Sequence, residues 1–269
     1  MVTDIGNFER DLIFDVGACH GDDSAYYLHK GYRVVAVEPD PRSVAHLKQR
    51  FADEIAQGRL SLVEAAIADE EGTASFWQCE DVPGWSSFAQ SNASANGARH
   101  HRIVVPTLRF RSLIEKFGTP LYCKIDIEGS DQLCLDDLTP DTRPPFTSIE
   151  IAYDGSTVLA DRTRALFGRL EALCYSRFKL ISQVSFRQPS MTFARVRARL
   201  PSSIGARLTA FTRWRRRRET DWIFDGDSSG PFGDATDGQW QTSQEARQLI
   251  AIILRNRDIS DWFDIHAAT

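Results

Sequence analysis

Two acidic residues flank a glycine-containing turn in the segment 11–40, and their spacing suits a nucleotide-type cofactor. The apolar run LIFDV contains Asp15 near its end, and Gly17 and Gly21 follow it. A helix-forming segment begins directly after Gly21, so its first free N–H groups could bind an anion. Seventeen residues past Gly21, Glu38 follows a second apolar run, RVVAV. In nucleotide-binding α/β folds, an acid at this place accepts hydrogen bonds from a ribose diol.

A purely structural explanation of these residues is also open. The glycines could simply shape a tight turn, and Glu38 could be a solvated strand end. Short motifs of this kind are weak evidence when they occur alone. The joint occurrence of Asp15, both glycines and Glu38 at expected strand ends favours a cofactor site.

The turn sequence discriminates between two cofactors. A dinucleotide fingerprint requires G-x-G-x-x-G, in which the second glycine admits a pyrophosphate. Here the string is GACHG, and Cys19 occupies that second-glycine position. S-adenosyl-L-methionine has no phosphate and would present its carboxylate to the loop and its ribose to Glu38. The pattern D-x-G-x-x-x-G therefore favours S-adenosyl-L-methionine over NAD.

A second group of chemically capable residues lies in the string KIDIEGSD. Lys124, Asp126 and Glu128 alternate, so they would share one face of a strand whose carboxyl end opens on the cleft. Acids in an apolar strand are costly unless they are paired or bound to a ligand. A Lys124–Asp126 ion pair that stabilises the strand end is the structural alternative. Asp126 and Glu128, with Glu150 third, are the candidate general bases. These three acids could in principle bind Mg²⁺, but nothing in their spacing requires it, and we predict no metal site.

Regular elements must position these residues. Apolar runs predict strands over residues 12–16, 33–37, 60–63, 121–127, 148–151 and 178–184. Helices are expected over 23–30, 160–174 and 244–257, with a further helix that Asp40 caps and Pro41 opens. Strands that alternate with helices predict an α/β fold, a doubly wound and mostly parallel sheet. Residues 79–101 form a long loop, in which 85–88 could cover the acceptor or tether the loop.

Charge is unevenly distributed along the 269 residues, whose net charge is only −5. Ten arginines and two acids lie between residues 187 and 222. We expect residues 1–186 to form the cofactor-binding core. Residues 187–269, a basic insertion with the last strand and a C-terminal helix, would complete the same domain. The insertion could face an anionic acceptor, form a solvated surface paired with the acidic body, or contact a membrane peripherally.

Composition bounds the cellular setting. The five cysteines are scattered and form no CxxC pair, which indicates buried thiols in a reducing compartment. The N-terminus lacks an apolar signal region, and no window offers about 18 uninterrupted apolar residues. A cytoplasmic protein without a transmembrane segment is expected. The sequence does not predict its oligomeric state.

The sequence resembles the FkbM family of S-adenosylmethionine-dependent methyltransferases. The likeness is carried by FDVGACHGDDS (14–24), VVAVEPDP (34–41), VEAAIADEEG (63–72), VPTLRFRSLIEKFG with KIDIEGSD (105–131), and SIEI (148–151). The family's first block is usually DVGAN-x-G, so Cys19 and His20 depart from it at variable positions. The family's TL-D-D stretch is TLRFR here, so no role can be carried over for those two acids. KIDIEGSD is close to the family's KIDVEGAE.

The resemblance implies a Rossmann-like methyltransferase fold, and it implies roles for named residues. Asp15, Gly17 and Gly21 would form the cofactor loop, Glu38 would hold the ribose, and Asp126 would lie beside the reacting end. The complete set of predicted cofactor-binding residues is Asp15, Gly17, Ala18, His20, Gly21, Ser24, Glu38, Pro39, Glu64, Ala65, Ala66 and Asp126. The resemblance favours O-methylation of a small acceptor, a sugar or natural product that could be anionic.

Two functions from other classes remain as alternatives. An NAD-dependent oxidoreductase is disfavoured by the missing middle glycine and by the lack of a recognisable hydride-transfer constellation. A non-enzymatic nucleic-acid-binding protein would use the arginine-rich segment. That segment contains no recognisable reading motif, and the acidic body would repel a polyanion.

Overall fold

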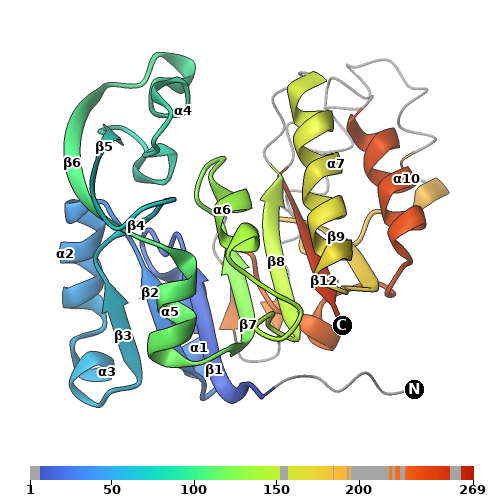
Figure 1. The fold of residues 1–269 in the computed structure, drawn as a ribbon, viewed down its shortest axis with the longest axis horizontal. Coiled ribbons are helices and arrows are strands. Elements are labelled where there is room, and N and C mark those ends of the chain that lie inside the picture. The colour runs from blue at the N-terminus through green and yellow to red at the C-terminus, as the bar shows by residue number, and fades with distance from the viewer. Residues whose placement is uncertain are drawn as a thin grey trace. The chain divides into compact units, whose positions relative to one another are not determined.

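The computed structural model describes residues 7–151, 157–183, 185–192, 194, 218–219, 222–224, 228–254 and 262–269. The chain divides into two compact units, Met1–Pro145 and Phe146–Thr269, drawn in Figure 1 in blue to green and in yellow to red, respectively. Each unit is described separately. The predicted α/β class with a mostly parallel sheet is confirmed, because four strands of the first unit run parallel to their neighbours.

A parallel sheet forms the centre of the first unit, with strand order β3-β2-β1-β7. These strands are Leu60–Val63 (β3), Arg33–Val37 (β2), Glu9–Val16 (β1) and Pro120–Ile125 (β7). All five residues from 12 to 16 are buried, as expected for a strand covered on both faces. The predicted strands 12–16, 33–37 and 60–63 are therefore confirmed.

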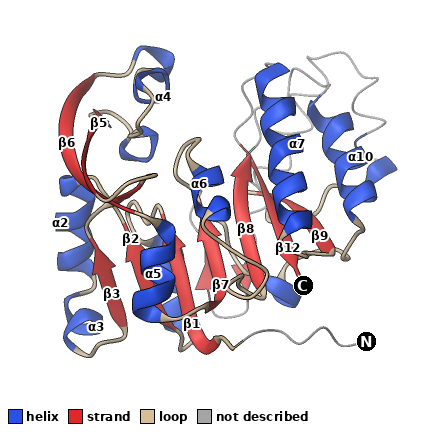
Figure 2. Cartoon of the chain, viewed as in Figure 1, coloured by secondary structure: helices blue, strands red, loops and turns tan. Residues whose placement is uncertain are grey.

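Helices cover both faces of β1 and β7. Phe14 of β1 packs edge-on against Phe110 of α5 (Phe110–Phe117), with ring centroids 6.2 Å apart. Tyr122 of β7 pairs in register with Ile13, the neighbour of Phe14, so Tyr122 lies on the opposite face. There it packs against Tyr27 of α1 (Asp22–His29) at 5.7 Å. Helices α1 and α5, both labelled in Figure 1, thus cover opposite faces, and Figure 2 shows α5 in front of the strands.

The helix after β2 begins where its cap predicts. Asp40 accepts a hydrogen bond from the backbone N–H of Arg42 at 2.9 Å, and Pro41 is the first residue of α2 (Pro41–Arg50). Val44 and Leu47 are buried. A short helix, α3 (Ala52–Ala56), continues from α2. This local prediction is confirmed because it depends only on neighbouring residues.

A second sheet in the first unit was not predicted. Its order is β4-β6-β5, with β4 Ala66–Ile67, β5 Gly72–Cys79 and β6 His100–Leu108. The connection between β5 and β6 contains a 3₁₀ turn at Pro83–Trp85, the short helix α4 (Gln90–Ala93) and a second 3₁₀ turn at Ala95–Gly97. The expected loop 79–101 is this connection. Helix α6 (Asp131–Asp136) follows β7.

The second unit contains an antiparallel strand, β12, whose range was not predicted. Strand β12 (Phe263–Ala268) lies between β8 (Phe146–Ile151) and β9 (Arg177–Ser182) and is antiparallel to both. Helices α7 (Thr157–Ala172) and α10 (Ser243–Leu254) match the predicted helices 160–174 and 244–257. The helix α10 is not the final element, because β12 follows it. Asp264 and His266 gave β12 the pattern of a half-exposed strand, yet all six of its residues are buried.

Little of the basic insertion falls within the described part of the chain. Residues 195–217, which include Arg213 and Arg215 to Arg217, lie outside it. A short ribbon of β10 (Arg218–Glu219) and β11 (Trp222–Ile223) follows. Among the described helices, none combines the length and apolar character needed to cross a membrane.

Candidate functional site

The loop between β1 and α1 is held across the end of β2. The backbone N–H groups of Gly17 and Ala18 both donate to the carbonyl of Val37, at 3.0 and 3.1 Å. Gly17 has φ +86° and faces the backbone of the residue that follows β7: a Cβ at Gly17 would lie 1.8 Å from the carbonyl oxygen of Asp126. The glycine therefore brings the loop into direct contact with an acid that lies 109 positions later in the chain.

Gly21 is required by a different protein contact. It has φ +82°, and a Cβ there would lie 2.5 Å from Cε2 of Phe51 and 2.6 Å from Cδ2 of Leu47. Both predicted loop glycines are thus fixed by packing within the protein. A side chain at either position would therefore clash with protein atoms and change the conformation of the loop, whether or not a ligand is bound.

Gly31 offers a matched control for the loop glycine. Gly31 has φ +89°, close to the value at Gly17, but a Cβ there would meet nothing within 4 Å. Alanine in this conformation costs about 1–2 kcal/mol at either position. We expect Gly17→Ala to lower affinity for S-adenosylhomocysteine at least about tenfold, whereas Gly31→Ala leaves it unchanged. Isothermal calorimetry checks this, and equal affinities in the two variants would contradict the contact with Asp126.

Glu38 lies against the loop and is buried, with 6% of its surface exposed. One carboxylate oxygen accepts the N–H of Cys19 at 2.8 Å, and the other accepts the N–H of Asp40 at 2.8 Å. Burial raises the pKa of Glu38 to about 7, although these two backbone hydrogen bonds oppose the rise. The carboxylate is therefore fixed in orientation at the end of β2, where the sequence placed the ribose-binding acid.

Two predicted cofactor residues lie inside the protein. Asp15 is fully buried, and its Oδ2 accepts a hydrogen bond from Oγ of Ser24 at 2.6 Å. Ser24 is equally buried. This pair ties the end of β1 to the first turn of α1, so both side chains shape the loop from beneath.

The other predicted cofactor residues divide by exposure. His20 is exposed, and its ring lies edge-on to His46 at 5.6 Å. Glu64 is half exposed and forms an ion pair with Lys48 at 2.6 Å. Buried or half-buried positions are taken by Ala18, Pro39, Ala65 and Ala66.

Lys124 joins three carboxylates beneath the loop. Its Nζ lies 3.4 Å from Oδ1 of Asp15, 3.4 Å from Oδ2 of Asp23 and 3.5 Å from Oδ2 of Asp126. It also donates to the carbonyl of Gly17 at 3.3 Å. The Lys124–Asp126 ion pair that the sequence suggested is therefore present, as one part of a larger cluster. Asp126 keeps 21% of its side chain exposed, against none for Asp15.

The start of α1 carries two acids of its own. Asp22 pairs with Arg50 at 2.6 Å, and Asp23 lies beside Lys124. These carboxylates already interact with the positive end of the helix dipole. Both acids also have a cation as partner, and the binding of the cofactor's carboxylate at this helix start stays a prediction.

Glu128 does not lie on the strand. Strand β7 ends at Ile125, and the N–H of Asp126 continues its pairing by donating to Val16 at 2.9 Å. Glu128 has φ +53°, the left-handed conformation, in the turn that follows. The expectation that Lys124, Asp126 and Glu128 share one strand face is wrong for Glu128, because the strand stops before it.

Asp131 organises that turn. Its two carboxylate oxygens accept the N–H groups of Ile127 at 3.0 Å and Gly129 at 3.1 Å. Burial raises the pKa of Asp131 to about 6, and these hydrogen bonds oppose the rise. No role was predicted for Asp131, although it is the last residue of the string KIDIEGSD.

The turn is also held from its other side. The carbonyl of Glu128 accepts hydrogen bonds from Nδ2 of Asn92 at 2.8 Å and from Oγ of Ser87 at 3.2 Å. Burial, together with the neighbouring Asp126 and Asp131, raises the pKa of the Glu128 carboxyl to about 8. No role was predicted for Asn92, and Ser87 was considered only within residues 85–88, as a cover or a tether. Their contacts with Glu128 were not predicted, because contacts between positions 36 and 41 residues apart leave no local signal.

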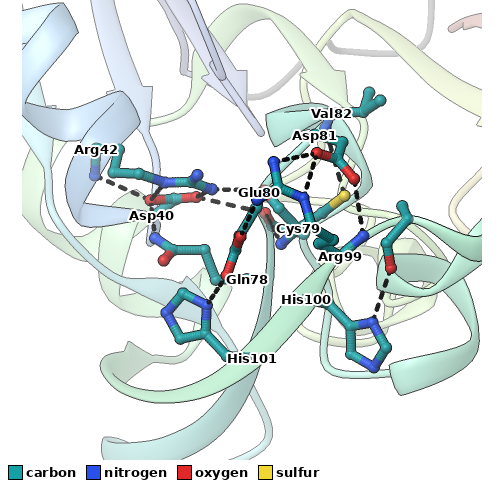
Figure 3. A network of polar contacts seen from close by, with 12 residues as sticks. Asp40, Arg42, Gln78, Cys79, Glu80, Asp81, Val82, Arg99, His100 and His101 are labelled. Carbon is teal, nitrogen blue, oxygen red and sulfur yellow. Dashed lines mark hydrogen bonds and ion pairs between the residues drawn. The ribbon is translucent and has the colours of Figure 1, made fainter.

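Asp40 extends the site towards β5, as Figure 3 shows. Its buried carboxylate accepts hydrogen bonds from Nε2 of Gln78 at 2.5 Å and Nη2 of Arg42 at 2.9 Å. Arg42 also donates to the carbonyl of Cys79 at 2.5 Å. The start of α2 is thereby fastened to the end of β5.

Glu150, the third candidate base, belongs to the second unit. It lies on β8, half buried, and pairs in register with Asp264 of β12.

Comparisons with known proteins match the chain to one family model and to several solved structures. A model of the methyltransferase FkbM domain matches residues 15–198. No curated protein matches the chain at a significant level. A precorrin-6Y C5,15-methyltransferase from Geobacter metallireducens GS-15 aligns at 10% identity and TM-score 0.40, covering 98% of this chain and 84% of that one. The C-terminal domain of the Rhodobacter capsulatus enzyme of that name aligns at 14% identity and TM-score 0.36, covering 66% and 68%.

A glycopeptide N-methyltransferase, MtfA, complexed with S-adenosyl-L-methionine, aligns at 12% identity and TM-score 0.30, covering 98% of this chain and 83% of that one. The range that the family model matches begins at Asp15. It includes the loop, Glu38 and the turn at residues 126–131.

Proposed function

This chain belongs to the FkbM family of methyltransferases, and from that premise we propose that it methylates a hydroxyl oxygen of a sugar or natural-product acceptor. Its activity as an S-adenosylmethionine-dependent methyltransferase follows from family membership. The oxidoreductase and nucleic-acid-binding alternatives have no comparable support. The observation that carries the proposal is the direct contact between the β1–α1 loop and Asp126 at Gly17, because it joins a cofactor loop to candidate catalytic acids.

The donor set of the first unit fits S-adenosylmethionine. Glu38 offers a fixed carboxylate to a ribose diol, and residues 64–66, which follow β3, would pass the adenine. Asp126, the most exposed of the three acids around Lys124, would attract the cationic end of the ligand. S-adenosylmethionine supplies an activated methyl group on a sulfonium. The residues Asp15 and Ser24 then contribute by fixing the loop.

The protein's remaining tasks are alignment of the acceptor, exclusion of water and removal of one proton. A hydroxyl acceptor loses its proton as the oxygen–methyl bond forms, so a nearby base assists the reaction. Glu128 is the preferred base of the first unit, because a pKa raised to about 8 makes its ionised carboxylate a stronger proton acceptor than an ordinary one. The ionised form that acts as the base increases as the pH rises towards 8. Asp126 is the second candidate, and Glu150 of the second unit is the third.

The acceptor is a small molecule, and we extend the proposal to an anionic one, such as a phosphorylated or nucleotide-linked sugar. The ten arginines between residues 187 and 222 support this extension, because the planar arginine fork suits phosphate. Most of that segment lies outside the described residues, so the support comes from its composition.

A thermal-shift experiment with S-adenosylhomocysteine, NAD and RNA in parallel tests the cofactor. We expect stabilisation by S-adenosylhomocysteine alone. Mass spectrometry of candidate sugars incubated with the enzyme and S-adenosylmethionine then tests the acceptor, with a mass gain at a hydroxyl as the expected result. Stabilisation by NAD alone, or methylation at nitrogen alone, would contradict the corresponding half of the proposal.

The site's acids predict a pH dependence. Burial raises the pKa of Glu38 to about 7 and that of Glu128 to about 8, both from 4.5. These two carboxyls therefore bind more protons in the folded protein than in the unfolded chain between about pH 4.5 and pH 8, so the stability that they contribute is lost as pH rises through that window. Ionised acids favour a cation, so we expect the ratio of S-adenosylmethionine to S-adenosylhomocysteine affinity to increase from pH 6 to pH 8.

Calorimetry with both ligands at both pH values measures this ratio. The two ligands share the same α-amino group and ribose, so the ratio isolates the effect of the sulfonium charge. A ratio that stays constant or falls would mean that these acids do not act on the sulfonium.

A further inference from the structure

We propose that Asn92 and Ser87 are positioning residues for Glu128, so that the connection between β5 and β6 belongs to the active site. This inference rests on the proposed function, in which Glu128 is the preferred base. Neither residue carries a chemically reactive group of its own, and both act through the backbone of Glu128. Residues 86–92 are called the strap below.

Two donors of the strap converge on one acceptor. Nδ2 of Asn92 and Oγ of Ser87 both donate to the carbonyl of Glu128, at 2.8 and 3.2 Å. A carbonyl oxygen has two lone pairs, so these donors complete its hydrogen bonding. Oγ of Ser87 also accepts the N–H of Ala89 at 3.1 Å, which fixes the direction of its own hydroxyl.

The strap is itself anchored, so its donors are held in place before any ligand binds. Ser87 and Trp77 exchange two backbone hydrogen bonds, at 2.8 and 2.9 Å. Phe88 packs edge-on against Phe76 at 5.4 Å, in a cluster with Ala66 and Val105. Of the two roles that the sequence suggested for residues 85–88, the hydrophobic tether is therefore the one that Phe88 performs.

Opposing hydrogen bonds fix the conformation of the turn. Asp131 accepts the N–H groups of Ile127 and Gly129, while the strap donates to the carbonyl of Glu128 between them. The left-handed conformation of Glu128, at φ +53°, is unfavourable for a residue with a Cβ. Loss of the strap contacts would allow the turn to relax, and the Glu128 carboxyl would move with it.

The strap also reaches the cofactor side of the site. Oγ of Ser86 donates to Oδ2 of Asp40 at 3.3 Å, and the N–H of Asp40 donates to Glu38 at 2.8 Å. One short segment thus contacts supports of both the ribose-binding acid and the base. The polar side chains of the strap are therefore held in place by hydrogen bonds to Asp40 and to the carbonyl of Glu128.

The test compares two amides of the same short helix. Asn92→Ala removes a donor to Glu128, whereas Gln90→Ala removes an amide that contacts His100 instead. The Glu128 carboxyl is titrated by ¹³C NMR, with its signal assigned through Glu128→Gln, and S-adenosylhomocysteine affinity is measured by calorimetry. Because burial is the main cause of the raised pKa, we expect Asn92→Ala to lower the pKa of Glu128 by about one pH unit or more.

Gln90→Ala should leave that titration unchanged, and both variants should bind S-adenosylhomocysteine within about twofold of the wild type. Ser87→Ala provides a second, independent removal of a donor. An unchanged titration of Glu128 in folded Asn92→Ala and Ser87→Ala proteins would overturn the positioning role. Failure of the wild type to bind S-adenosylhomocysteine would instead overturn the proposed function, so the two failures are distinguishable.

Discussion

Replacement of Glu38 by alanine is expected to weaken binding of S-adenosylhomocysteine at least about tenfold. One charged acceptor serves two ribose hydroxyls in the proposed complex, and each hydrogen bond to a charged group contributes about 1.5–3 kcal/mol. The same carboxylate fixes the loop by accepting the N–H of Cys19. Alanine therefore removes both a ligand contact and a loop contact. Calorimetry on the folded variant measures the loss.

Two further substitutions sharpen this result. Glu38→Gln keeps the size of the side chain, but its NH₂ group must face an N–H of either Cys19 or Asp40. We expect it to bind as poorly as the alanine variant. Glu64→Ala is the control, because Glu64 is half exposed and paired with Lys48. Unchanged affinity for S-adenosylhomocysteine in folded Glu38→Ala would show that Glu38 does not bind the ligand. A loss of affinity in Glu64→Ala would instead indicate that the ribose binds near the end of β3.

Lys124→Met is expected to lower the free energy of unfolding by about 3–5 kcal/mol. The lysine ammonium is only 5% exposed and lies between three carboxylates, of which Asp15 and Asp23 are almost fully buried. Methionine has a similar length but no charge, so these acids would lose their shared cation in a poorly solvated place. Denaturant unfolding measured at pH 7 checks the size of the effect.

Lys48→Met is the matched control for that experiment. Lys48 also forms an ion pair with a carboxylate, but both side chains of its pair with Glu64 are about half exposed. Exposed ion pairs contribute about 0–1 kcal/mol, so little change is expected. Equal effects of the two lysine substitutions would contradict the view that Lys124 neutralises a buried acidic cluster.

The sequence by itself determined the elements whose causes are local. An apolar run buried on both faces predicts a parallel strand. The predicted strand 33–37 has the bounds of β2, and the predicted strand 12–16 ends where β1 ends but begins after its start at Glu9. Asp40 and Pro41 mark the start of α2, because a cap acts on the next three residues only. The family resemblance could be found from the sequence because it is carried by short motifs that combine a strand end, a turn and a helix start.

Tertiary structure alone decided how the site is assembled. Three contacts join segments that are distant in sequence. Gly17 lies against the carbonyl of Asp126, Asp15 and Asp23 lie beside Lys124, and Asn92 donates a hydrogen bond to the carbonyl of Glu128. Hydrogen bonds and ion pairs of this kind do not follow the side-chain periods of about 2.0 residues in strands or about 3.6 in helices, so no periodic pattern in the sequence predicts them. The burial of Asp264 and His266 in strand β12 also depends on tertiary structure, because neighbouring strands on both sides cover a face whose residue types are those of a solvated one. Local sequence thus fixed where the chain turns, and the packing of distant segments fixed which acids meet.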